Sequence, residues 1–244
     1  PEVGYLRRAG FTRLAGDAQL KYYPTSGKIN RHGPMVDYDF TYFPERGMTD
    51  YDLNLMYNVL YKNFSQLTFR FRRDYTKLTD DFDPTNTGGE KLKANEAFVY
   101  YSMNISLVTD QRKKLFGRFQ TRSGQYFNGT RINLDADISY RIQPYGSIST
   151  VISYNKLKFP SPYKSVDLIL VGPKVDLTFT RSLFLSALIQ YNNQINNINT
   201  NIRFQWRFAP ASDLFIVYTD NYYADSYTSK GSALVLKATY WFNL

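Results

Sequence analysis

Polar and apolar residues alternate with a period of two along most of this chain, and no other feature limits its fold as strongly. Residues 131–142 read RINLDADISYRI, with polar, mostly charged side chains at odd positions and apolar or aromatic ones at even positions. Because side chains alternate between the two faces of a strand, this stretch predicts one β-strand with an apolar and a charged face. The apolar face would form the core of a soluble β-sandwich, or it would face lipid in a membrane β-barrel.

The same alternation recurs along the whole chain, and we find no convincing helix. The expected strands cover residues 3–8, 12–23, 36–42, 50–61, 66–72, 96–107, 115–123, 131–142, 147–156, 170–180, 183–192, 198–208, 213–219 and 234–244. We therefore predict an all-β fold with about fourteen strands. Residues 1–244 would form one domain.

Two features favour an antiparallel transmembrane β-barrel over a sandwich. Several stretches keep the period for about 9–13 residues, whereas strands of globular sheets have a mode of roughly 5–6 and membrane strands need about 9–11. The connections also alternate between short turns and longer loops, as in bacterial outer-membrane barrels, with residues 79–95 and 220–231 the longest. Residues 24–34 are an exception, because the alternation assigns this long polar connection to the periplasmic side.

The charged face of the predicted barrel carries nearly equal numbers of cations and anions, so the net charge of +9 lies mainly in turns and loops. This balance disfavours a strongly anion-selective pore. It also disfavours nucleic acid, which needs a basic face without interleaved acids. The charged residues expected to line the lumen are Arg70, Arg72, Arg118, Arg122, Arg131, Asp135, Asp137, Arg141, Lys174, Asp176, Arg203, Arg207 and Lys237.

The sequence offers little for catalysis, and we expect no enzyme, cofactor or metal site. The only histidine, His32, lies in a Gly/Pro segment, where a solvated turn residue is favoured over a catalytic base. Asp135 and Asp137 share a strand face with Arg131 and Arg141, which favours a salt-bridge ladder over an acid–base pair.

Metal binding finds equally little support. The chain has no cysteine and no second histidine, which leaves no thiolate or imidazole ligand set. Residues 79–89 contain oxygen ligands for Ca²⁺, but their spacing departs from that of an EF-hand loop. A surface loop rich in turn residues is the favoured interpretation of this segment.

Short motifs spread over nearly the whole chain carry a resemblance to a known family. The motifs are PEVGYLRR at 1–8, GG at 88–89, FNG at 127–129, QYNN at 190–193, NIRFQWRF at 201–208, PASDLFIVY at 210–218 and KATYWF at 237–242. The chain resembles the C-terminal β-barrel region of Bacteroidota outer-membrane proteins that carry an N-terminal carbohydrate-binding, family-nine-like module and have no characterised function. One departure is Ala209-Pro210-Ala211, where that family tends to have a basic residue before the proline and a glycine after it.

The resemblance implies a C-terminal fragment, with a signal peptide, the binding module and further strands upstream of Pro1, and it supplies no catalytic residues. We expect a porin-like protein of the bacterial outer membrane that acts as a channel or uptake component for solutes or glycans. The expected partners are outer-membrane lipid and lipopolysaccharide, whose phosphates suit the loop lysines, together with other envelope proteins. The alternative is a non-conducting membrane anchor or scaffold subunit of an envelope complex that carries a glycan-binding module.

Overall fold

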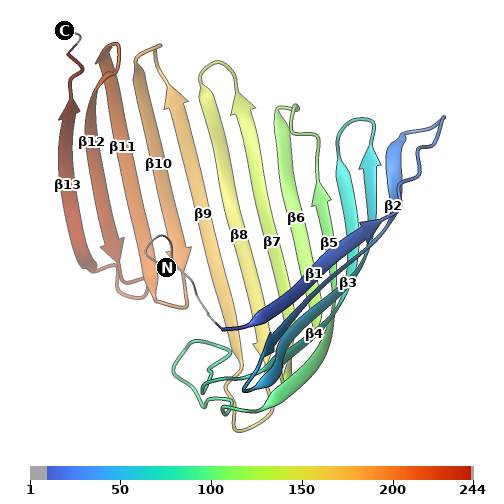
Figure 1. Ribbon diagram of the computed structural model, residues 1–244. Helices are drawn as coiled ribbons and strands as arrows, with labels where there is room; N and C mark the ends of the chain where they lie inside the picture. The colour runs from blue at the N-terminus through green and yellow to red at the C-terminus, as the bar shows by residue number, and fades with distance from the viewer. Residues whose placement is uncertain (1–9, 243–244) are drawn as a thin grey trace. The chain divides into compact units, whose positions relative to one another are not determined.

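The protein is an antiparallel β-meander. The computed structural model describes residues 10–242, in which thirteen strands form one sheet and each strand pairs with its neighbours in the sequence (Figure 1). The strands are β1 (Thr12–Gln19), β2 (Ile29–Phe43), β3 (Gly47–Tyr61), β4 (Gln66–Lys77), β5 (Ala97–Val108), β6 (Leu115–Tyr126), β7 (Gly129–Ile142), β8 (Gly146–Lys158), β9 (Val166–Thr178), β10 (Leu183–Asn192), β11 (Asn197–Ala209), β12 (Ser212–Tyr222) and β13 (Ser229–Thr239). The all-β, antiparallel prediction is confirmed. The expected strand over 3–8 lies outside the described residues.

Most strand boundaries differ from the prediction by a few residues, and three of the differences change a connection or a strand end. β2 begins at Ile29, so the polar connection expected over 24–34 spans only residues 20–28. β6 and β7 run on to a two-residue turn, Phe127-Asn128, where a longer loop was expected. β13 ends at Thr239, five residues earlier than predicted.

The chain divides into two compact units. Unit 1 comprises Pro1–Leu107, Gln120–Asn133 and Lys156–Val166, and therefore contains all of β1–β4. Unit 2 comprises Val108–Phe119, Leu134–Asn155 and Asp167–Leu244, and contains all of β10–β13. Strands β5–β9 contribute residues to both units.

The strands are long, and the two ends of the sheet are unpaired. β1 has 8 residues, β2 and β3 have 15 each, and the others have at least 10. Within residues 10–242, β1 pairs with β2 alone and β13 with β12 alone, so the sheet is not closed into a barrel. No helix in these residues is long and apolar enough to cross a membrane.

The tightest apolar packing in unit 1 surrounds the long connection between β4 and β5, residues 78–96. Phe82 and Leu92 form an isolated β-bridge within this connection, and Leu92 is fully buried. The ring of Phe82 packs 5.3 Å from that of Phe127 in the β6–β7 turn, and Phe127 packs 5.5 Å from Tyr100 of β5. The connection is therefore a folded element that packs against the strand ends of unit 1.

Candidate functional site

Burial in unit 1 is inverted relative to a soluble sheet. We call the face that carries Asn54, Asp74 and Ser102 the polar face; these residues are exposed by only 6%, 4% and 4%. The opposite, apolar face includes Leu55 and Met103, exposed by 50% and 61%. In water-soluble proteins buried polar groups are the minority and large apolar side chains gather inside. Here the polar side chains form the packed face, and the apolar side chains form the open one.

Two facing carboxylates anchor an ion network on the polar face. Antiparallel pairing of β3 with β4 places Asp52 directly opposite Asp74. Two like charges at such a position repel each other. The guanidinium of Arg72 resolves this, with Nη2 lying 2.5 Å from Asp52 Oδ1 and 3.0 Å from Asp74 Oδ1. Nη2 of Arg122 on β6 lies 2.8 Å from Oδ2 of Asp74. The network therefore contains two carboxylates and two guanidinium groups.

The network is enclosed and tied into neighbouring strands. The side chains of Asp74, Arg122 and Arg72 are exposed by only 6%, 18% and 23%. Nε of Arg122 also donates to Ser102 Oγ at 3.0 Å. Among the described residues, Nε of Arg72 is buried without a hydrogen-bond partner. Balanced charges with low exposure make this a structural brace, because a buried ion needs a partner to offset its desolvation.

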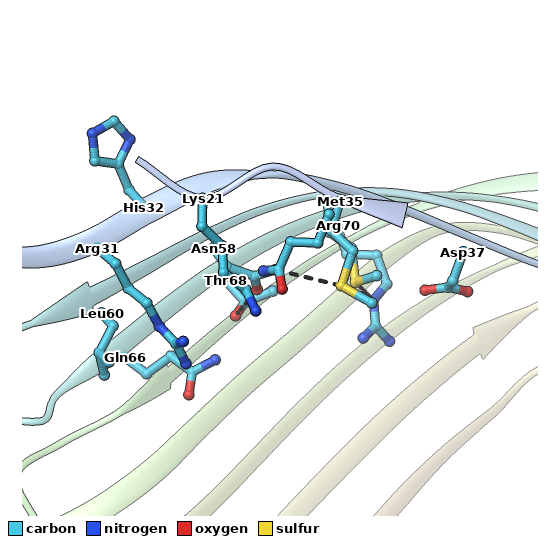
Figure 2. Close-up of a pocket in the computed structure, with 12 residues that line it drawn as sticks. Lys21, Arg31, His32, Met35, Asp37, Asn58, Leu60, Gln66, Thr68 and Arg70 are labelled. Carbon is cyan, nitrogen blue, oxygen red and sulfur yellow. Dashed lines mark hydrogen bonds between the residues drawn. The ribbon is translucent and has the colours of Figure 1, made fainter. Parts of the chain in front are cut away.

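A cavity of about 410 Å³ lies on the same face, among β1–β4 near the β3–β4 turn. Figure 2 shows the long side chains of Lys21, Arg31 and Arg70 on one side of the strands. Asp37 is the one carboxylate among the described residues that line the cavity, and it accepts a 2.7 Å hydrogen bond from Asn54. The cavity is therefore basic.

Two sequence-predicted lumen residues, Arg72 and Arg122, belong to the network, and Arg70 lines the cavity. In unit 2, Lys174 pairs with Asp176 at 2.8 Å and Arg207 with Asp213 at 3.4 Å. Arg203 donates to Gln205 at 2.8 Å. Arg118, Asp137 and Lys237 are exposed residues of β6, β7 and β13.

The residues of the motif RINLDADISYRI have partners on neighbouring segments. Arg131 lies over the ring of Tyr126, with Cζ 4.4 Å from the centroid. Asp135 accepts a 2.6 Å hydrogen bond from Ser153 of β8. Arg141 donates to the carbonyl oxygen of Gln111 at 2.6 Å. The ladder of ion pairs that the sequence predicts for this strand stays a prediction.

His32 does not join the charged groups. It lies in β2 and not in the turn that the sequence predicts. It is among the residues that line the cavity, but in Figure 2 its ring points to the opposite side from the side chains of Lys21 and Arg31. Nδ1 of His32 lies 2.6 Å from the hydroxyl of Tyr57, which follows Met56 on β3 and belongs to the apolar face.

In the acidic connection 78–96, the carboxylate of Asp83 accepts hydrogen bonds from backbone amides of the same segment. Asp83 Oδ1 accepts hydrogen bonds from the amide of Thr85 at 2.8 Å, and Oδ2 accepts from the amides of Thr87 at 3.0 Å and Gly88 at 2.9 Å. Partial burial acts to raise the pKa of Asp83, but the hydroxyl and amide of Thr85 and the amides of Thr87 and Gly89 lower it to about 2. No cluster of three or more His, Cys, Asp or Glu side chains suited to a metal ion occurs in residues 10–242.

Sequence reasoning missed Arg31 as a residue of the cavity, whereas it placed Lys21 among the cations of the charged face. Arg31 lies in the segment expected to be a loop and Lys21 near the end of the expected strand 12–23, and the bridge between Tyr22 and His32 brings both into the sheet. Asp52 and Asp74 were expected on the charged face, but not as facing partners. The alternation predicts which face of the strand a residue occupies. The pairing register determines which residue lies opposite it on the next strand, and the alternation alone does not predict the register.

Comparison of the chain with family models, with curated proteins and with solved structures finds no match in any of the three.

Proposed function

We propose that the chain forms the wall of an outer-membrane β-barrel that acts as a porin-like channel or uptake component for solutes or glycans. The observation that carries this proposal is the inverted burial of unit 1, with packed polar side chains on one face and open apolar side chains on the other. In lipid, the apolar face is satisfied by acyl chains and the polar face becomes the lumen. The short family motifs identified in the sequence support the same assignment.

The strand lengths support a membrane-spanning sheet. Strands of 10 to 15 residues extend roughly 33–50 Å at about 3.3 Å per residue. Tilted by about 45°, they would rise roughly 23–35 Å, against an apolar band about 25 Å tall in outer-membrane barrels. Strands of a soluble sandwich need only about half this length.

The unpaired edges of β1 and β13 also bear on the proposal. An open edge exposes backbone N–H and C=O groups, and each unsatisfied group costs several kcal/mol in the bilayer core. We therefore propose that both edges are paired in the inserted protein, so that the sheet closes as part of a barrel. The sequence resemblance suggests that additional strands enlarge it.

Surface features are consistent with outer-membrane partners. Tyr42, Tyr61 and Tyr191 lie at or next to strand ends, where aromatic girdles meet the headgroups. Lysines in the connections, such as Lys113 and Lys164, suit the phosphates of lipopolysaccharide. Both features favour an outer-membrane location.

Planar-bilayer recording tests the channel directly. The protein, refolded in detergent and reconstituted, should give stepwise conductance that is absent from protein-free membranes. Extraction provides a second test, because a membrane barrel requires detergent to leave the envelope fraction whereas a soluble β-sandwich leaves it with buffer alone. Release by buffer would refute the membrane assignment, and a folded, inserted protein without conductance would refute the channel.

One observation favours the alternative, a non-conducting anchor or scaffold that carries a glycan-binding module. The polar face of unit 1 is closely packed by the ion network, and connection 78–96 packs against the strand ends beside it. Such packing reduces the open cross-section available to solutes. Silent bilayers together with co-purified envelope proteins would support this role.

A further inference from the structure

We propose that the cavity on the polar face of unit 1 is a binding site for a sugar-sized solute that carries a carboxylate or phosphate group. The proposal goes beyond the channel, because it assigns a ligand class to particular residues whether or not the protein conducts. It is argued from the charge, the spacing and the backbone of the residues around the cavity.

Among the residues that the structure describes, the cations of the cavity form no ion pair, in contrast to three other arginines of the polar face. Arg72 and Arg122 pair with carboxylates, and Arg13 of β1 pairs with Asp39. Within residues 10–242, Lys21, Arg31 and Arg70 form no ion pair.

Asp37, the one carboxylate of the described chain that lines the cavity, does not neutralise them. Asp37 lies opposite Asn54 in the β2–β3 register and is held by its amide. Nε of Arg70 donates to the weakly accepting sulfur of Met56 at 3.1 Å. Three cations therefore share one cavity with one carboxylate that is already hydrogen-bonded, which leaves a net positive site for an anion.

The spacing of the cations indicates the size of the ligand. Arg31 pairs with Leu60, and Arg70 pairs with Met56, four residues earlier on β3. Their backbones are therefore separated by about 13 Å along the strands and by about 10 Å across two strand intervals. A charged monosaccharide is long enough to place its charged group on one arginine and its hydroxyls near the other, contacts that a bare phosphate lacks. The volume of about 410 Å³ falls in the usual range for small-molecule sites.

The remaining lining groups suit the hydroxyls of such a ligand. Asn58 and Thr68 lie opposite each other on β3 and β4, and Thr68 donates to Asn58 at 2.9 Å. Gln66 and Gln19 add further amides to the wall. Amide and hydroxyl groups accept and donate hydrogen bonds to sugar hydroxyls, while guanidinium groups bind carboxylate and phosphate through two parallel N–H donors.

The backbone comes close to a neighbouring segment at Gly33. A Cβ added at Gly33 would lie 2.1 Å from the carbonyl oxygen of Leu20, which directly follows β1, so this approach leaves no room for a side chain. Gly33 pairs with Asn58, which lines the cavity, so a glycine is required at the edge of the site. The close approach at Gly33 is therefore part of the backbone pairing beside the cavity.

Isothermal titration calorimetry of the full chain, folded in an uncharged detergent, tests the site. The probes are glucose 6-phosphate and glucuronate, with neutral glucose and inorganic phosphate as comparisons. Both charged sugars should bind with a Kd of about 1 mM or tighter, at least about tenfold more tightly than glucose or phosphate. Added salt should weaken the binding. Equal affinity for glucose would overturn the role of the cations, and equal affinity for phosphate would overturn the ligand size.

Charge-removing variants complete the test. Arg70→Gln and Arg31→Gln should each weaken binding of the charged sugars by about tenfold, whereas Arg203→Gln, which removes a cation from unit 2, should leave it unchanged. Circular dichroism checks that each variant folds, and Lys21→Gln serves if an arginine variant does not. Unchanged affinity in folded Arg70→Gln and Arg31→Gln would overturn the proposal. Because the titration needs no conduction, a failed site and a failed channel give separate results.

Discussion

The ion network of β3, β4 and β6 predicts that Asp74 is among the most costly charges to remove from this protein. Asp74→Asn keeps the shape of the side chain but removes one of two negative charges that face Arg72 and Arg122. The network then holds two cations and one anion. Since Arg122 is exposed by only 18%, water cannot replace the missing carboxylate.

The expected magnitude follows from burial. Removing one partner of a buried ion pair costs about 3–5 kcal/mol, because the other charge stays desolvated and unpaired. Asp52 remains within reach of Arg72, and the amide of the new asparagine keeps part of the hydrogen bonding. We therefore expect the free energy of unfolding to fall by about 2–4 kcal/mol.

Urea unfolding of the protein in detergent, followed by circular dichroism, measures this loss. The matched control is Asp176→Asn, the same change in a pair whose Lys174 and Asp176 side chains are exposed by 44% and 41%. That pair should contribute only about 0–1 kcal/mol, as exposed pairs do. The double variant Asp74→Asn with Arg122→Gln should cost less than the sum of the single changes. An Asp74→Asn loss no larger than that of Asp176→Asn would refute the brace.

Three further predictions concern the backbone and the β4–β5 connection. Ala211 has φ of +54°, a conformation that favours glycine. Ala211→Gly should therefore raise the free energy of unfolding by about 0.5–1 kcal/mol, measured as a higher urea midpoint; a lowered midpoint would contradict this. Gly33→Ala should lower the free energy of unfolding by about 1–3 kcal/mol through the clash with Leu20, while Gly231→Ala, with no atom within 4 Å, should change it little. The pKa of Asp83 is lowered to about 2, so its contribution to stability is complete above its ordinary pKa, near 4, and is lost as the pH falls towards 2. Melting curves at several pH values should therefore show Asp83→Ala less stable than wild type at pH 6, with the gap closing near pH 2; a constant gap would contradict the role of the carboxylate.

The alternation of polar and apolar residues was sufficient to predict the fold class, the antiparallel meander and the position of most strands. The segment 24–34 shows where it was wrong. Gly33 and Pro34 are turn residues in isolation, yet Pro34 pairs with Tyr57 and the strand continues to Ile29. Pairing with the long neighbouring strand β3 outweighs the local turn preference of these residues. The polar–apolar pattern of one strand does not show which strand it will pair with, so it could not predict this outcome.

The candidate site was predicted only in part, for a related reason. Arg70, Arg72 and Arg122 were expected on the charged face, and they lie there, but the alternation made them equivalent. The register separates them: it sets Asp52 opposite Asp74, within reach of Arg72, and sets Arg70 opposite Met56. A shift of one residue in pairing would move each side chain to the other face, so these roles depend on information that the sequence distributes over two or more strands.

The polar face of unit 1 therefore contains two kinds of cation, those paired with a carboxylate and those that line the cavity. The positions of the carboxylates determine to which kind each cation belongs. Where Asp52 and Asp74 face each other, two arginines are drawn in and the space is filled. Where Met56 lies opposite Arg70, Arg70 forms no ion pair within residues 10–242 and space remains. A face on which every cation is ion-paired would suit a non-conducting anchor. A uniformly basic face would bind many anions without discriminating between them. A filled brace beside an open basic cavity instead favours selective binding of one charged solute at a fixed place on the wall.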